Sequence, residues 1–193
     1  MICLFDTETT GFVNRQAPPK HPIQPRLLQF AALVLNEAGE QQSEHNFMIV
    51  QPAGTQIHPS AAAAHGLTLD IVNASGLTIQ DAYARFKALR EECSTWLAFN
   101  AEFDIFIMRI FAAHAAQPDL MAGAALGCIM RPLVPVLKLP GRYNDYKFPK
   151  LAEAHKFCTG HDFENAHDAL ADVKASAEVY RWMLKNDIKF EPV

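Results

Sequence analysis

Two carboxylates follow an apolar run at the start of the chain, MICLFDTETTG. Residues 1–5 are typical of a buried strand, and Asp6 and Glu8 come directly after it. An ionised carboxylate at the end of a buried strand is costly unless a cation pairs with it. Side chains two apart in a strand point to the same side, so both acids would face one partner. Two interpretations stay open here: a strand end that turns into solvent, or a pair of metal ligands.

A third acid, Asp104, interrupts the apolar stretch 103–111 within FNAEFDIFIMRIF. Glu102 can turn outward near the start of the helix that this stretch predicts, whereas Asp104 lies one turn from Met108. The alternative to a catalytic role is an acid in the first turn, where it would complement the helix dipole.

The segment AHDALADVKASAEVY holds a fourth acid and a histidine. Asp168 and Asp172 are four residues apart and therefore share one helix face. His167 comes just before this helix and can project beyond its N-terminus. Asp168 is also a good N-cap, and Asp172 could be a solvated helical acid, so neither residue alone demands a catalytic role.

The elements that would carry these residues follow from the hydrophobic pattern. We expect strands at residues 1–5, 26–36, 44–50, 96–99 and 126–130, and helices at 59–65, 79–93, 101–115 and about 168–185. Gly66 would end the first helix, and Thr78 would cap the second. A meander followed by alternating helices and strands predicts one mixed sheet flanked by helices. The prolines within residues 12–25 exclude a regular helix or ladder there.

Length and composition fit one ordinary α/β domain over residues 1–193, because half of the residues are hydrophobic and a fifth are charged. No apolar run reaches the ~18 residues of a membrane span, and a cleaved signal peptide would remove the opening motif. The cysteines are far apart, which favours reduced thiols in a cytoplasmic protein. The net charge of −4 argues against a strongly basic nucleic-acid coat but not against a nuclease with an acidic metal site.

Taken together, the three acidic segments form an ordered pattern: DxExTG at residues 6–11, NxxxD with Asn100 and Asp104, and HxxxxD with His167 and Asp172. The pattern resembles the 3′→5′ exonucleases of the DEDD superfamily, in the histidine-containing DEDDh or DnaQ-like branch that includes polymerase proofreading subunits and RNase T-like enzymes. IHPSAAAAHGLT at 57–68 and LLQFAALV at 28–35 are similar to further family segments. The resemblance implies an RNase H-like α/β fold, with a mixed five-stranded sheet flanked by helices on both faces.

The resemblance also implies a catalytic set with two Mg²⁺ or Mn²⁺ ions, hard cations that prefer carboxylate and water oxygens. Asp6 would bridge both ions, and Glu8 and Asp172 would complete the site of the ion that carries the attacking water. Asp104 would hold the second ion through water. His167 would be the general base, a role that suits a side chain with an ordinary pKa near ~6.5.

For the 3′ end of the substrate, the resemblance implies contacts from the backbone of Thr9 and from Ala64 and His65. Phe12 directly follows the motif and is a candidate wedge that stacks on terminal bases, with a core phenylalanine as the alternative. His65 could instead cap its own short helix. Asn100 is expected to be an N-cap, a role compatible with a place near the scissile phosphate. Five cations could follow the phosphate backbone: Lys20, Arg26, Arg142, Lys147 and Lys150.

We therefore expect a metal-dependent exonuclease that releases nucleoside 5′-monophosphates from DNA, favours single-stranded ends, and acts in proofreading or repair. RNase T-like or oligoribonuclease-like trimming of RNA is the close alternative. A catalytically silent binding module of the same fold would lack an acid, and all four acids and the histidine are present. A phosphatase of the haloacid dehalogenase type is more distant, because Glu8 replaces the second Asp of DxDxT and no later lysine motif is evident.

Three further expectations concern Asp168, the loop and the partners. The family spacing selects Asp172, so we assign Asp168 to capping. The Pro-rich loop over residues 14–25 is a lid or guide for the strand, or padding without a role in catalysis. The chain ends eight residues after Lys185, which favours a free-standing enzyme or a minimal proofreader. A polymerase partner is not evident, and a monomer and a homodimer both remain open.

Overall fold

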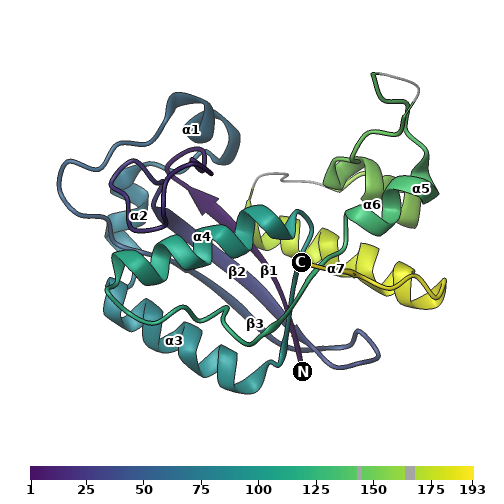
Figure 1. Cartoon of the computed structure of the whole chain (residues 1–193), viewed down its shortest axis with the longest axis horizontal. Coiled ribbons are helices and arrows are strands. Elements are labelled where there is room, and N and C mark those ends of the chain that lie inside the picture. Colours follow the sequence, from purple (N-terminus) through teal and green to yellow (C-terminus); the bar gives the residue numbers. More distant parts are fainter. Residues whose placement is uncertain (143–144, 164–167) are drawn as a thin grey trace.

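The computed structural model describes residues 1–142, 145–163 and 168–193. Its centre is a mixed sheet (Figure 1), in which the strands have the order β3-β2-β1-β4-β5-β6. The strands are β1 (Ile2–Thr9), β2 (Leu27–Leu35), β3 (Gln41–Met48), β4 (Thr95–Ala98), β5 (Ala125–Cys128) and β6 (Glu191–Pro192). β1, β2 and β3 form the predicted antiparallel meander, whereas β4 and β5 run parallel to β1 and β6 pairs antiparallel with β5. The α/β class and the five predicted strands are confirmed, and the two-residue β6 adds a sixth.

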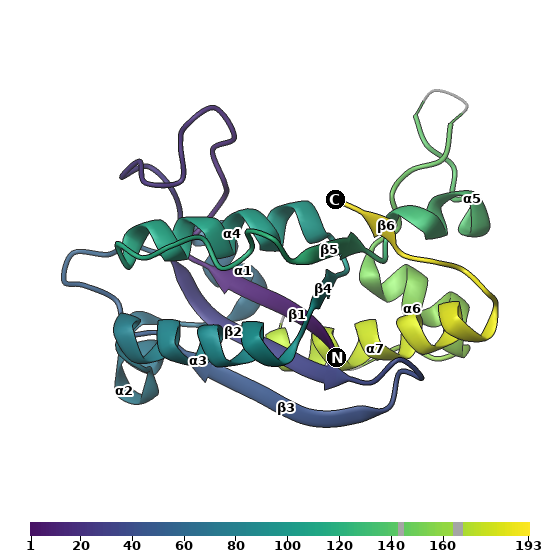
Figure 2. The same cartoon turned by 60° about the horizontal axis from the view of Figure 1, so that its bottom comes forward.

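The helices lie on both faces of the sheet (Figure 2). They are α1 (Pro59–His65), α2 (Leu69–Ser75), α3 (Ile79–Glu92), α4 (Ala101–His114), α5 (Val134–Leu137), α6 (Leu151–Thr159) and α7 (Ala169–Lys185), with a 3₁₀ turn at Arg131–Leu133. Gly66 ends α1 with a φ of 69°, and the Thr78 side chain caps α3, both as predicted. α2, α5 and α6 were not predicted, because helices of four to nine residues show little of the 3.6-residue period.

The sheet separates two apolar cores. Side chains of α3 and α4 pack on the face that carries Cys3, Phe5 and Phe30. Side chains of α6 and α7 pack on the opposite face, with Leu4 and Leu33. Because β1 contributes odd-numbered residues to one core and even-numbered residues to the other, its two faces look toward different helices.

None of the helices in the described parts of the chain combines the length and the apolar character needed to cross a membrane.

Candidate active site

The first two acids lie on one side of β1, as the DxE spacing predicts. Asp6 and Glu8 are partly exposed, while Thr7 and Thr9 between and after them are buried. The even positions of β1 face α6 and α7, so both carboxylates point toward the α7 side of the sheet. The strand pairs with parallel β4 only from Ile2 to Leu4. The acids therefore extend past the paired part of the parallel strands, at the carboxyl end where α/β sheets bind ligands.

Helix α7 brings the third acid to the same place. Carboxylate oxygens of Asp6, Glu8 and Asp172 all lie within 4.8 Å of one another. The helix begins where it does because Asp168 caps it: its Oδ1 accepts from the N–H of Leu170 at 3.1 Å and of Ala171 at 3.0 Å. This confirms the capping assignment of Asp168 and places Asp172 in the first helical turn.

The fourth acid approaches from the opposite face of the sheet. Asp104 lies on α4, is 3% exposed, and is not a member of the group of three. Its Oδ1 accepts a hydrogen bond of 2.6 Å from the Thr7 hydroxyl, which points to the α4 side of β1. Sequence reasoning missed Thr7, although its position between two acids of a strand already implied that it faces the other way.

Crowding and burial of the acids disfavour their ionised forms. The pKa of Asp6 is raised well above its usual range, first by burial and then by the charges of Asp104, Glu8 and Asp172. Burial and the charges of Asp172 and Asp104 raise the pKa of Glu8 to about 8. Burial raises the pKa of Asp104 to about 7, against the opposing effect of the hydrogen bond from Thr7. Such a cluster is stabilised by added positive charge.

These observations fit a divalent cation. The donors are carboxylate oxygens, the ligands that Mg²⁺ and Mn²⁺ prefer, and three of them lie within 4.8 Å of one another. Asp104 contributes the strongest neighbouring charge at Asp6 and so lies close enough to take part. His167, the predicted general base, lies outside the described residues.

Of the predicted substrate residues, His65 contacts the end of β1. His65 Nδ1 accepts from the N–H of Leu67 at 3.0 Å, so the proton resides on Nε2, which donates to the Thr9 carbonyl at 3.1 Å. His65 thus supports both its own helix end and the strand end. Ala64, the preceding residue of α1, is exposed.

Phe12 is 70% exposed, so the alternative of a core phenylalanine is wrong. Its ring meets that of His58 edge to face, with the centroids 5.4 Å apart. Asn100 occupies the N-cap position of α4, but its exposed side chain makes no capping hydrogen bond.

The predicted phosphate-tracking cations are dispersed. Lys147 pairs with Glu153 at 2.5 Å, and Lys150 precedes α6 as its N-cap residue. Lys20 and Arg142 are exposed, and Arg26 is partly buried beside Gln51. Glu102 does turn outward, and pairs with Arg15 and Arg131.

The fold is similar to that of several solved exonucleases. E. coli Exonuclease I in complex with a dT13 oligonucleotide superposes with a TM-score of 0.76 at 20% identity, over 94% of this chain and 40% of that one. Exonuclease I from Methylocaldum szegediense superposes with a TM-score of 0.69 at 20% identity, over 95% of this chain and 40% of that one. A 3′-exonuclease described as recognising the histone mRNA stem-loop superposes with a TM-score of 0.74 at 17% identity, over 98% of this chain and 83% of that one. The present chain thus spans two fifths of the Exonuclease I chains.

No curated protein matches the sequence. The model of the RNase T exonuclease family matches residues 3–180, a span that contains all four acids and nearly the whole chain. The chain belongs to the exonuclease family.

Proposed function

We propose that this chain is a metal-dependent 3′→5′ exonuclease, with residues 1–193 acting as one catalytic domain that releases nucleoside 5′-monophosphates. The observation that carries the proposal is the convergence of Asp6, Glu8 and Asp172 within 4.8 Å, with buried Asp104 beside them, in a chain of the exonuclease family. Membership of this family also makes the haloacid dehalogenase alternative unnecessary.

The four carboxylates would hold two Mg²⁺ or Mn²⁺ ions. Bound about 3.5–4 Å apart, such a pair stabilises negative charge on the attacking and leaving oxygens of a phosphodiester. Asp6 would contact both ions, and Glu8 and Asp172 would complete one of the two sites. Asp104 would hold the other through water, which agrees with its place outside the group of three.

The remaining residues would orient the substrate and move a proton. His167 would take a proton from the attacking water, a role for which an imidazole suits neutral pH. Exposed Phe12 would stack on a terminal base. Ala64 and His65 would contact the terminal nucleotide, with Thr9 held by His65, and Asn100 would lie near the scissile phosphate.

Single-stranded DNA is the substrate that we favour, and 3′-end trimming of RNA is the second candidate. Support for DNA comes from the similarity to Exonuclease I, solved with a dT13 oligonucleotide. Support for RNA comes from the 3′-exonuclease that recognises a histone mRNA stem-loop, of which this chain covers 83%. A silent binding module is disfavoured, because the four acids are present and carboxylate oxygens of three of them lie within 4.8 Å of one another.

Timed digestion of 5′-labelled DNA and RNA oligomers tests the proposal, with single- and double-stranded forms and with Mg²⁺, Mn²⁺ or a chelator. We expect a ladder that shortens from the 3′ end, and no products with chelator. Asp172→Asn should abolish activity, whereas the matched Asp168→Asn should retain most of it, because asparagine also caps helices well. Internal cleavage, activity in chelator, or equal losses in the two variants would contradict the proposal.

A further inference from the structure

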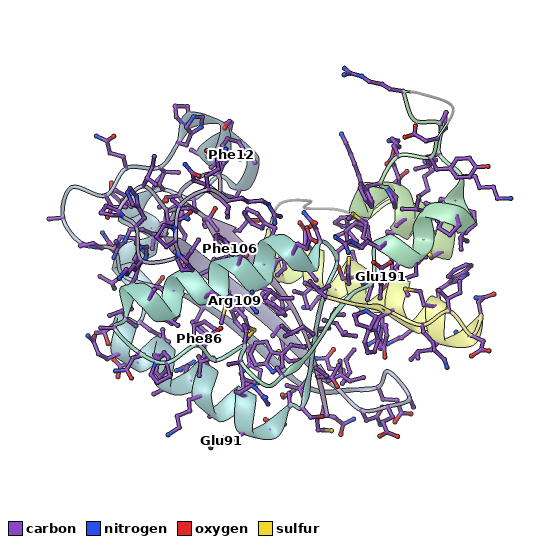
Figure 3. All side chains as sticks on the ribbon, in the orientation of Figure 1. Phe12, Phe86, Glu91, Phe106, Arg109 and Glu191 are labelled. Carbon is purple, nitrogen blue, oxygen red and sulfur yellow. The ribbon has the colours of Figure 1, made fainter. Side chains whose placement is uncertain are left out.

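A groove opens next to the proposed active site, between two loops that are far apart in the sequence. It is lined by residues 10–12, 22–26 and 52–59 and has a volume of about 680 Å³. We call this feature the loop groove. Figure 3 shows Phe12, one of its lining residues, beside α1, at the end of the sheet where β1 terminates.

A buried side-chain amide, that of Gln24, helps to hold the Pro-rich wall of the loop groove. Gln24 is 4% exposed, and its Nε2 donates to the carbonyls of Asn14 and Ala17, both at 2.8 Å. Its Oε1 accepts from the N–H of Asn14 at 3.1 Å. Backbone turns from Pro18 to His21 and from His21 to Gln24 close the rest of the loop. The wall is therefore preformed, which lowers the entropic cost of binding a ligand against it.

Thr10 joins both walls to the strand that carries the acids. Its N–H donates to the Arg26 carbonyl at 2.9 Å, and its carbonyl accepts from the N–H of His58 at 2.7 Å. The N–H of Arg26 donates to the Thr10 hydroxyl at 2.8 Å. Thr10 comes two residues after Glu8, or about 7 Å along an extended chain. The lining of the loop groove thus begins two residues after Glu8, at the end of the strand that carries two of the acids.

The lining of the loop groove suits an anion with apolar parts. Among its described lining residues there is no Asp or Glu, whereas Arg26 carries a positive charge. Within the described chain no ion pair involves Arg26, whose Nε donates to Gln51 at 3.1 Å. Phe12 and Ile23 add apolar surface, 70% and 60% exposed.

We propose that the loop groove binds the nucleotides of a single strand that lie upstream of the 3′-terminal one, with Arg26 on a phosphate and Ile23 against a base. This inference rests on the proposed function and assigns a role to the Pro-rich loop. The volume lies in the range of ~300–1,000 Å³ that encloses drug-sized molecules, which is room for one or two nucleotides. Arg26 and Ile23 would therefore determine how strongly the enzyme prefers oligomers to dinucleotides.

Two substrates separate the loop groove from the catalytic site. The p-nitrophenyl ester of thymidine 5′-monophosphate reaches only the acids, whereas oligothymidylates of two to ten nucleotides also reach upstream. For the wild type we expect KM to fall with length until the groove is filled. For Ile23→Asp and Arg26→Gln we expect KM for dT10 to rise about tenfold, the size of one lost stacking or phosphate contact. Their kinetics on the ester should be unchanged.

Matched controls are Ile71→Asp and Arg109→Gln, which change an exposed isoleucine and a partly exposed arginine outside the groove. The proposal would be overturned if KM of Ile23→Asp and Arg26→Gln fell with oligomer length as it does in the wild type. It would also be overturned if these variants lost activity equally on the ester and on dT10.

A binding assay separates failure of the groove from failure of the proposed function. Fluorescence anisotropy of labelled dT10 is measured on Asp104→Asn, with and without the groove substitutions. A tenfold weaker Kd in the groove variants supports the groove even if the wild type hydrolyses nothing, in which case the proposed function alone fails. The proposal for the loop groove is overturned if the groove substitutions leave Kd unchanged, or if Asp104→Asn alone does not bind dT10.

Discussion

The replacement Asp104→Asn should abolish hydrolysis and yet make the metal-free protein more stable at high pH. Asp104 is 3% exposed, and burial raises its pKa from 3.8 to about 7. A carboxylate that must ionise in such a place destabilises the fold, and asparagine has the same shape without the charge. The amide oxygen of the asparagine can still accept the hydrogen bond from Thr7.

The magnitude follows from the pKa difference of about three units between the folded and the unfolded chain. At 1.36 kcal/mol per unit, the ionised Asp104 costs about 4 kcal/mol above pH 7. The amide NH₂ of the introduced asparagine loses water on burial, at a cost of ~1–3 kcal/mol. The variant should therefore gain about 1–3 kcal/mol at pH 8. Relief of repulsion at Asp6, where Asp104 is the strongest neighbouring charge, adds to this gain.

Whether Asp104→Asn is more or less stable than the wild type depends on pH. A carboxyl group with a raised pKa in the folded state carries no penalty below its unfolded pKa of ~4. The penalty grows from pH 4 to 7 and is constant above. At pH 5 the penalty is about 1–2 kcal/mol, similar to the cost of burying the amide, so the Asn variant should be no more stable than the wild type.

Urea unfolding in chelator at pH 5 and pH 8 measures the difference, with Asp70→Asn, which replaces an exposed aspartate, as the control. Adding Mg²⁺ at pH 8 should stabilise the wild type more than the variant. A variant that is destabilised equally at both pH values would refute the reasoning.

Three further predictions test the supporting residues. Thr7→Val removes the donor to Asp104 and should raise the Mg²⁺ concentration for half-maximal activity about tenfold, measured by metal titration of the rate, because partners that orient ligands typically have effects of this size. A variant that reaches half-maximal activity at a lower Mg²⁺ concentration than the wild type would contradict this role of Thr7. His65→Ala breaks the contact with the Thr9 carbonyl and should raise KM more than it lowers kcat on single-stranded oligomers; a loss confined to kcat would be the contrary result. Gly66→Ala forces a side chain into a φ of 69° and should cost about 1 kcal/mol in urea unfolding, although nothing lies within 4 Å of the added methyl group. No loss would show that the end of α1 relaxes freely.

The sequence was most informative where one residue decides a local structure. The alternation of β1 predicted that Asp6 and Glu8 share a face, and the capping chemistry of Asp168 and Thr78 predicted where two helices begin. The order of strands and helices predicted the mixed sheet, since meanders and crossovers have few ways to close on one core.

The features that were missed depend on packing between distant segments. Thr7 holds Asp104 across 97 positions of the chain, and no spacing rule links the two. The two-residue β6 exists only because β5 offers an edge to pair with. The loop groove arises where Thr10 holds together two loops that are separate in the sequence. Such contacts become visible only after the chain has folded.

Anomalous diffraction from crystals soaked in Mn²⁺ tests the central claim most directly. We predict two peaks about 3.5–4 Å apart among Asp6, Glu8 and Asp172, with Asp104 on the side of the second ion. Maps without a peak between these carboxylates, at Mn²⁺ concentrations that support hydrolysis, would contradict the account.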